Sequence, residues 1–370
     1  MSKVRGIVNL FHTPSLGVLT QRRNFASVTF LGRYGLIDFI MSDFTNSGID
    51  QVDILTKTYS TSVRNHISHG ATFLNNTKTG SLTIVANEMG VDNKQEDNEI
   101  TAILANKFNP DKLHADYILI APAHLLMVCD FRPFIEKHIK SKKDISILGL
   151  DNDLIESDFY KDCHRLIIKD NKLTDIRFDA NEGLVSLDTC IMSREVYAQM
   201  IKEQPMVSKT YGFHDMLNYY LRNDSRSFEV QLFNRVVLPI TSIENYTHFS
   251  FWMLPYEHRR QFFQEKELPI YTKSHDTPPV LYKEKAEVIN SFIANGSVIN
   301  GTVRNSIVSR DVKIDEGAVV ENSILFTATE IGKDSKLNYV ITDKNVVIKD
   351  NVSMSGQENG LLLIHQGELR

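Results

Sequence analysis

Cysteine is scarce in this chain of 370 residues, which contains only Cys129, Cys163 and Cys190. The three are an odd number and form no Cys-x-x-Cys pair, which argues against both a disulfide framework and a zinc site. We therefore expect three buried thiols in a reducing compartment, none of them catalytic.

Long apolar runs and a strong net charge are also missing. No segment approaches the ~18 consecutive apolar residues of a membrane span, and the apolar run near Met1 is too short for the core of a signal peptide. The formal net charge is −5, and the 41 lysines and arginines are scattered, so nothing draws the chain to nucleic acid or to an anionic membrane. The sequence predicts a cytoplasmic protein that binds neither of them.

The first 240 residues alternate short β-branched runs with amphipathic stretches, which is the pattern of a sheet with helices on its faces. Helical spacing of apolar residues predicts helices around Ile37 to Phe44 and Phe131 to Ile139. Strands buried on both sides are predicted at Arg5–Asn9, Val52–Thr56, Tyr117–Ile120 and Ile145–Leu148. The sequence therefore predicts a doubly wound α/β domain.

From about Ala286 apolar residues recur singly between polar and turn-forming residues. Three sets repeat every 17 residues: Val303, Val320 and Leu337; Ile307, Ile324 and Ile341; Ile314, Ile331 and Ile348. Within each turn, apolar residues lie six apart. A long period divided into sixes indicates a parallel β-helix, whereas a sandwich of hairpins would show strict alternation. The spacing does not determine the handedness of the coil.

The run from Phe30 to Gly48, FLGRYGLIDFIMSDFTNSG, is long and specific. Together with Ile54–Thr56, His66–Ile67 and the pair His214–Asp215, it resembles the ADP-glucose pyrophosphorylases, or glucose-1-phosphate adenylyltransferases. Members of that family carry a nucleotidyltransferase domain first and a left-handed β-helix last, so the resemblance spans nearly the whole chain.

The resemblance and the patterns together imply three parts. Residues 1–240 are expected to form a Rossmann-like nucleotidyltransferase domain. Residues 241–285 are expected to form a helix, near Thr241 to Leu254, and a proline-containing connector. Residues 286–370 are expected to form a left-handed β-helix of the hexapeptide type.

Members of this family convert ATP and glucose 1-phosphate to ADP-glucose and pyrophosphate in glycogen biosynthesis. The reaction consists mainly of positioning and charge neutralisation, so it needs backbone N–H groups around the phosphates, a basic clamp and carboxylates that hold magnesium. The family's glycine-rich loop corresponds to Leu10–Leu16, which contains no glycine. Phe11 is bulky where the backbone must approach a phosphate, Pro14 has no N–H, and Ser15 stands at the position of the catalytic arginine.

Other reactive positions of the family are replaced as well. The first metal aspartate falls on Ala123 or His124, the second on Pro239, and the lysine that grips the glucose phosphate on Asp179. The family's GTADAV nucleotide-contact run reads NEITAI at residues 98–103, without glycine or aspartate. The sequence therefore predicts no catalytic residue, no bound cofactor and no metal in this chain.

This combination of an intact scaffold and a missing reaction centre resembles the GlgD-type regulatory subunit. The resemblance implies a non-catalytic or weakly active subunit that modulates a catalytic GlgC-type partner in a hetero-oligomer, expected to be a tetramer, with magnesium only in the partner. Arg22 and Arg23 align with a basic pair near the family's allosteric site, and guanidinium groups bind phosphate bidentately. They are the candidates for binding a sugar-phosphate effector.

Two alternatives remain open. The chain could be an active enzyme with unusual residues, in which Asp116 or Asp130 holds the metal, although Asp130 is better explained as a helix cap. It could also be a stand-alone sugar-phosphate sensor. His12 could touch a phosphate in either case, but a solvent-exposed loop histidine is the simpler interpretation.

Overall fold

The computed structural model describes residues 3–68, 70, 72–75, 78, 80–86, 97–106, 110–151, 154–178, 180–263 and 267–365. The chain divides into two compact units. The α/β unit comprises Met1–Pro14, Ile37–Thr241 and Glu265–Tyr271. The β-helix unit comprises Ser15–Leu36, Ser242–Gln264 and Thr272–Arg370.

The described residues of the α/β unit form a nine-stranded sheet in the order β10-β9-β11-β6-β1-β4-β5, with β8 pairing with β11 and β12 pairing with β8. Strands β5, β4, β1 and β6 are parallel, and β11 is antiparallel to β6. The strands are β1 (Val4–Leu10), β4 (Gln51–Thr56), β5 (Ser81–Ala86), β6 (Tyr117–Pro122), β8 (Ile145–Leu150), β9 (Arg165–Lys169), β10 (Lys172–Arg177), β11 (Leu184–Ser193) and β12 (Phe228–Phe233). All four strands predicted from the sequence are confirmed.

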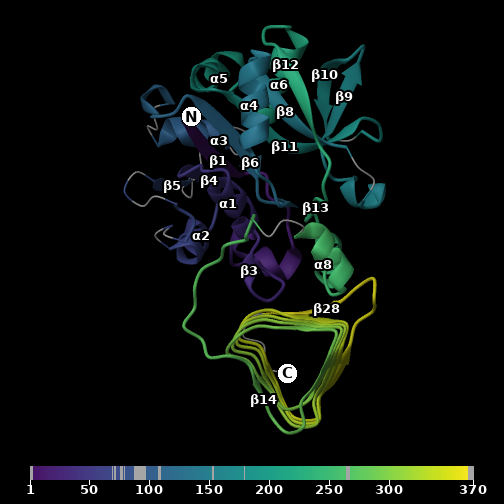
Figure 1. Cartoon of the computed structure of the whole chain (residues 1–370). Coiled ribbons are helices and arrows are strands. Elements are labelled where there is room, and N and C mark those ends of the chain that lie inside the picture. Colours follow the sequence, from purple (N-terminus) through teal and green to yellow (C-terminus); the bar gives the residue numbers. More distant parts are fainter. Residues whose placement is uncertain are drawn as a thin grey trace. The chain divides into compact units, whose positions relative to one another are not determined.

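Helices cover both faces of this sheet (Figure 1). They are α1 (Ile37–Asn46), α2 (Ser60–Ile67), α3 (Glu99–Ala105), α4 (Arg132–Ser141), α5 (Arg194–Val207) and α6 (Phe213–Arg222). Ile7 of β1 packs in one core cluster with residues of α3, α5 and α6. The adjacent Gly6 faces the other way, where a Cβ atom would lie 2.6 Å from the ring of Phe44 in α1. The predicted doubly wound, Rossmann-like arrangement is therefore confirmed.

In the β-helix unit, short parallel strands stack in three five-stranded sheets, whose coils enclose a triangle in Figure 1. The strands are β14 (Leu281–Tyr282), β15 (Glu287–Ile289), β16 (Phe292–Ile293), β17 (Val298–Ile299), β18 (Thr302–Arg304), β19 (Ile307–Val308), β20 (Lys313–Ile314), β21 (Val319–Glu321), β22 (Ile324–Leu325), β23 (Glu330–Ile331), β24 (Lys336–Asn338), β25 (Val340–Thr342), β26 (Val347–Ile348), β27 (Ser353–Ser355) and β28 (Leu362–Ile364). The arrangement is consistent with a left-handed β-helix.

The 17-residue period corresponds directly to the stacking of the coils. Val303, Val320 and Leu337 pair in register in one sheet, and the two isoleucine sets pair in the same way in the other sheets. The corners between the strands of successive coils recur at the same interval. At two equivalent corners, Asn305 and Asn322 adopt left-handed backbone angles, with φ of 46° each. Asparagine tolerates this conformation better than most residues.

Other elements complete the two units. The β-helix unit also contains β2 (Thr29–Phe30), β3 (Tyr34–Gly35), α7 (Ile243–Trp252) and α8 (Tyr256–Phe262), and the α/β unit contains the pair β7 (Leu125–Leu126) and β13 (Leu238–Pro239). Helix α7 confirms the helix predicted near Thr241 to Leu254. All three cysteines are buried, as expected. Across the described part of the chain, every helix is too short or too polar to cross a membrane.

The buried His138 of α4 makes stability depend on pH. His138 is 2% exposed, and its Nδ1 lies 2.8 Å from the hydroxyl oxygen of Ser146. Burial lowers the pKa of His138 below its ordinary value of 6.5. The unfolded chain therefore takes up a proton at a higher pH than the folded chain, and the free energy of unfolding should fall as the pH drops below 6.5.

Urea denaturation at a series of pH values measures this effect. His138→Gln should reduce the loss of stability on acidification, while His114→Gln, which replaces an exposed histidine, should leave it unchanged. Equal pH dependence in the unaltered chain and in His138→Gln would contradict the prediction.

Candidate functional site

A cleft of about 620 Å³ opens in the α/β unit beyond the carboxyl ends of β1 and β6. This edge is where open α/β sheets bind their ligands. The cleft is lined by Asn9, His12, Thr13, Pro14, Pro122, His124, Asp162, His164, Phe178, Asp188, Gly212, His214, Asp215 and Thr241. Histidines and carboxylates therefore dominate its polar lining.

The loop after β1 does not present a phosphate cradle. Phe11 is 8% exposed and packs into the hydrophobic core of the unit. Its backbone N–H donates to the side chain of Asn9 at 3.1 Å, and Pro14 has no N–H to offer. Two positions of this loop therefore offer no free N–H to a phosphate.

His12, from the same loop, contacts the buried carboxylate of Glu99 at the start of α3. His12 Nε2 lies 3.2 Å from Glu99 Oε2, and the His12 side chain is 62% exposed, which agrees with the predicted exposed loop histidine. The hydrogen bond to Glu99 raises the pKa of His12. Burial alone would raise the pKa of Glu99, but the hydrogen bond and charge of His12 outweigh it, and the pKa is lowered. Glu99 also accepts the backbone N–H of Phe213 at 2.6 Å and so fixes the start of α6.

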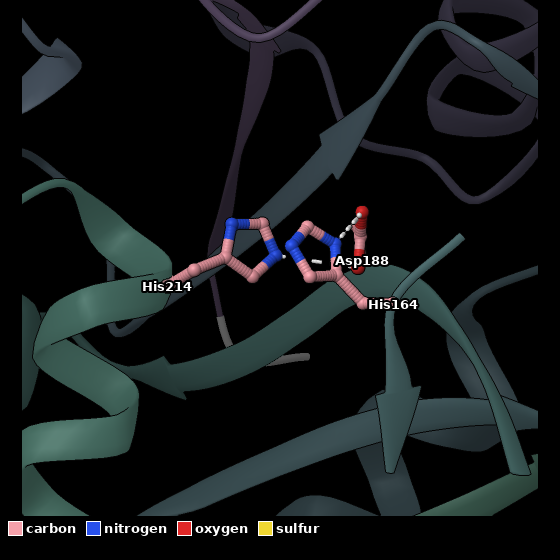
Figure 2. Close-up of side chains that lie close together, drawn as sticks. All are labelled: His164, Asp188 and His214. Carbon is pink, nitrogen blue, oxygen red and sulfur yellow. Dashed lines mark hydrogen bonds and ion pairs between the residues drawn. The ribbon is translucent and has the colours of Figure 1, made fainter. Parts of the chain in front are cut away.

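His164, Asp188 and His214, which also line the cleft, form a compact cluster (Figure 2). His164 Nδ1 lies 2.9 Å from Asp188 Oδ2, and His214 Nε2 lies 3.2 Å from Asp188 Oδ1. The two imidazole rings stack with centroids 4.2 Å apart. The cluster therefore places three donor groups of the kind that bind metals around one point.

Each member of the cluster comes from a different element. His164 immediately precedes β9, His214 lies in the first turn of α6, and Asp188 lies on β11. The pairing of β11 with β8 shifts register between Ser186 and Cys190, and Asp188 sits in this irregularity with φ of 48°. Such a bulge turns a side chain out of the regular ladder, which explains how a carboxylate from a largely buried strand reaches the cleft.

The cluster also shifts the pKa values of its members. Burial alone would raise the pKa of Asp188, but the neighbouring His214 and His164 hold it well below its usual range. Burial alone would lower the pKa of His214, but attraction to Asp188 raises it above 6.5. His124 lies 4.0 Å from Asp188, and burial lowers its pKa to about 4. The cleft thus holds one firmly ionised carboxylate and one neutral imidazole at neutral pH.

The lining of the cleft has the wrong charge for a polyphosphate. Asp162, Asp188 and Asp215 supply carboxylates, and no lysine or arginine is among the described residues that line it. The N–H groups at the start of α6 are also occupied, because Gly212 N–H donates to Asp215 Oδ2 at 3.0 Å and Phe213 N–H donates to Glu99. The cleft therefore favours a cation over an anion.

Comparison with known proteins gives two family matches. The model described as "Nucleotidyl transferase" matches residues 16–157, and the model described as "GlmU-like, C-terminal hexapeptide" matches residues 280–359. The glucose-1-phosphate adenylyltransferase of Desulfitobacterium hafniense (strain DSM 10664 / DCB-2) is 24% identical over 354 residues, which cover 93% of this chain and 87% of the relative. That of Bacillus thuringiensis (strain Al Hakam) is 25% identical over 369 residues, which cover 95% of each. The chain is thus similar, at low identity and over nearly its whole length, to glucose-1-phosphate adenylyltransferases.

The positions that align with the adenylyltransferase magnesium site do not fit that ion. Ala123 is 1% exposed and has no ligand atom, and His124 offers an imidazole where magnesium requires hard oxygen donors. Pro239 is buried in β13, paired with Leu125 of β7. Asp179, which aligns with the adenylyltransferase lysine, lies outside the described residues. The expectation that this chain binds no cofactor stays a prediction.

The two aspartates considered as substitute metal ligands have other roles. Asp130 precedes α4, whose N-cap is Phe131 and not Asp130 as expected; it pairs with the side chain of Arg132 at 2.7 Å and accepts its backbone N–H at 2.9 Å. Asp116 lies before β6, at the sheet edge opposite the cleft, and accepts the N–H of Lys3 at 2.8 Å. Neither residue lines the cleft.

The predicted effector pair lies in the β-helix unit. Arg22 is exposed. Arg23 is 6% exposed and donates from Nη2 to Asp343 at 2.6 Å, while its buried Nη1 has no hydrogen-bond partner among the described residues. The two side chains are therefore differently placed, and the anion site stays a prediction.

Sequence reasoning missed the cluster of His164, Asp188 and His214, and it also missed the role of Glu99. His214 was noted only as part of a family pair. Asp188 carried a local signal, because it is the one acidic residue in the otherwise apolar and small-polar run LVSLDTCIMS of β11. Such a residue requires a partner, but the sequence does not show which residue supplies it.

Proposed function

We propose that this chain is a non-catalytic or weakly active regulatory subunit of ADP-glucose pyrophosphorylase, of the GlgD type, which modulates a catalytic GlgC-type subunit in a mixed oligomer. The observation that carries the proposal is the lining of the cleft. It holds carboxylates and histidines, without a lysine or arginine among its described residues, at the edge where the family's reaction takes place.

The chemistry of nucleotidyl transfer explains why the charge of the cleft lining matters for activity. Negative charge is spread over the phosphate oxygens in the transition state, and cationic side chains and magnesium stabilise it. Asp188, which lies in the cleft with its pKa well below the usual range, would repel the same charge. At Phe11 and Pro14, two backbone donors that could compensate are missing, because the Phe11 N–H binds Asn9 and proline has no N–H.

The scaffold around this cleft supports a role in assembly and not a general decay of the protein. The segment from Phe30 to Gly48, which carries the family resemblance, forms β3 and α1, and nearly every residue of α1 is buried. The β-helix retains complete in-register stacking over its described coils. If the whole protein no longer had a function to maintain, substitutions would be expected in helix α1 and in the β-helix as readily as in the cleft.

ADP-glucose synthesis tests the proposal when it is measured for this chain alone, for a catalytic subunit alone and for the two mixed. Loss of a single charge-stabilising group costs about 10²–10³ in rate, so the chain alone should be at least about a thousand-fold slower than the catalytic subunit. In the mixture, the catalytic subunit's affinity for substrate or for a sugar-phosphate effector should change by about 5- to 150-fold, the usual range of allosteric coupling.

Size-exclusion chromatography of the mixture accompanies the assay, and heat-denatured chain serves as the control addition. Turnover by the chain alone at a rate comparable to the catalytic subunit would contradict the proposal. Separate elution of the two proteins, with unchanged kinetics in the mixture, would remove the regulatory role and favour a stand-alone sensor.

A further inference from the structure

The donor atoms of His164, Asp188 and His214 all lie within 4.8 Å of one another. Zinc binds imidazole nitrogen and carboxylate oxygen at about 2.0–2.2 Å, which places the ligand atoms of a tetrahedral site roughly 3.3 Å apart. The separations of 2.9 Å and 3.2 Å from Asp188 to the two histidines are close to this value. The distance between the two histidine donor atoms lies within the same 4.8 Å limit.

Asp188 has a buried carboxylate oxygen, Oδ1, whose ion pair with His214 lacks well-formed hydrogen-bond geometry. Its side chain is 7% exposed, and its Oδ1 is buried without a hydrogen bond from any described residue, although His214 Nε2 lies 3.2 Å away. A buried carboxylate oxygen without a donor is costly. A cation held between Asp188 and His214 would satisfy this oxygen.

The type of donor selects the class of ion. Two imidazole nitrogens and one carboxylate oxygen suit zinc and similar divalent transition metals, whereas magnesium and calcium prefer sites made of oxygen. The expectation of no metal in this chain rested on the lost magnesium aspartates and on the absence of a cysteine pair, and it did not consider a site formed by two histidines and an aspartate.

We propose that His164, Asp188 and His214 bind one divalent transition-metal ion of the zinc class, with a fourth coordination position open to the cleft. All three residues line the cleft, and the His124 ring lies beside them, with Nε2 4.0 Å from Asp188 Oδ2. The site goes beyond the regulatory role and does not depend on it, because the metal binds whether or not a catalytic subunit is present.

Neighbouring residues hold the three ligands in place. The Asp188 backbone N–H donates to Ser186 Oγ at 3.0 Å. The ring of Phe178 packs edge-on against the His164 ring, with ring centroids 5.4 Å apart. Glu99 fixes the start of α6, which carries His214, through the N–H of Phe213. Contacts of this kind orient metal ligands and contribute to metal affinity.

Metal titration of the purified full-length chain tests the site. The protein is first stripped with a chelator, and zinc chloride is then added in a calorimeter. Cobalt chloride is added in a parallel experiment, because the visible absorption of bound cobalt indicates whether nitrogen ligands hold it and whether few ligands surround it. We expect one zinc per chain and cobalt absorption that excess zinc abolishes.

Three variants separate a metal site from a purely structural cluster. His164→Gln, Asp188→Asn and His214→Gln should each weaken zinc binding by more than the roughly 10- to 100-fold cost of losing an outer contact, and each should abolish the cobalt absorption. His114→Gln, which replaces an exposed histidine outside the cleft, is the control and should bind as the unaltered chain does.

Circular dichroism and thermal unfolding in chelator show that each variant is folded before metal is added. Asp188→Asn keeps the shape of the side chain and serves if either histidine variant fails to fold. Absence of zinc binding by the unaltered chain would overturn the proposal. So would binding of equal stoichiometry and affinity in folded triad variants, because the cluster would then be structural only.

Discussion

Replacing Asp53 with alanine should lower the free energy of unfolding by about 3–5 kcal/mol, because it leaves a buried arginine without its counter-ion. Arg5 on β1 and Asp53 on β4 are 8% and 0% exposed. The guanidinium donates to both carboxylate oxygens, at 2.5 Å from Nε and 2.7 Å from Nη2, and its Nη1 donates to Gln51 at 3.2 Å. Gln51 alone cannot compensate the charge of Arg5 after the substitution.

Urea denaturation followed by circular dichroism measures the loss. The matched control is the double variant Arg5→Met with Asp53→Leu, which removes both charges and should restore most of the stability, since apolar residues often replace a buried ion pair at little cost. A loss below about 1 kcal/mol in Asp53→Ala, the range of exposed ion pairs, would show that the pair is not buried as described.

Replacing Ile331 with alanine should cost about 2–5 kcal/mol in the β-helix unit. Ile331 is 1% exposed and pairs with Ile314 in the coil before it and Ile348 in the coil after it. Removal of its side chain opens a cavity inside the coil, and the hydrogen-bonded strands on both sides restrict how far the walls can collapse. Ile331→Val, which removes a single methyl group, should cost about 0.5–1.5 kcal/mol.

The neighbouring Glu330 provides the control for this series. It lies on the same short strand but faces solvent and pairs with Lys313 at 2.7 Å. Glu330→Ala should therefore change stability by no more than about 1 kcal/mol. The prediction fails if Ile331→Ala and Glu330→Ala shift the urea midpoint equally, because burial would then not distinguish the two faces of the strand.

The coil repeat shows how much a sequence can reveal when the determining interactions are periodic. Val303, Val320 and Leu337 were predicted to stack from their spacing alone, and they pair in register. Four strands of the sheet were visible in a similar way; β6 and β8, for example, are short, mostly apolar runs that are buried almost throughout. In both cases the local pattern of apolar and polar side chains indicates which face of each strand is buried.

The candidate site could be predicted only in part. The resemblance to the family predicted that reactive residues are missing from the loop after β1 and from the metal positions. The structure agrees with this expectation at Phe11, which packs into the core. The sequence did not show which side chains line the cleft in place of the family's reactive residues. Carboxylates and imidazoles are common in any sequence, and their chemistry depends on the neighbours that the fold supplies.

The sequence by itself determined four strands of the sheet and the coils of the β-helix, whereas the loss of the family's reactive residues was inferred from the family resemblance. Tertiary structure alone decided that His164, Asp188 and His214 meet in one cleft. It also decided that Arg23 pairs with Asp343, 320 residues away, so that adjacent arginines are placed differently. The physical reason is that periodic burial is encoded by neighbouring residues, whereas a cluster of polar groups depends on where distant segments are brought together by the packing of the core.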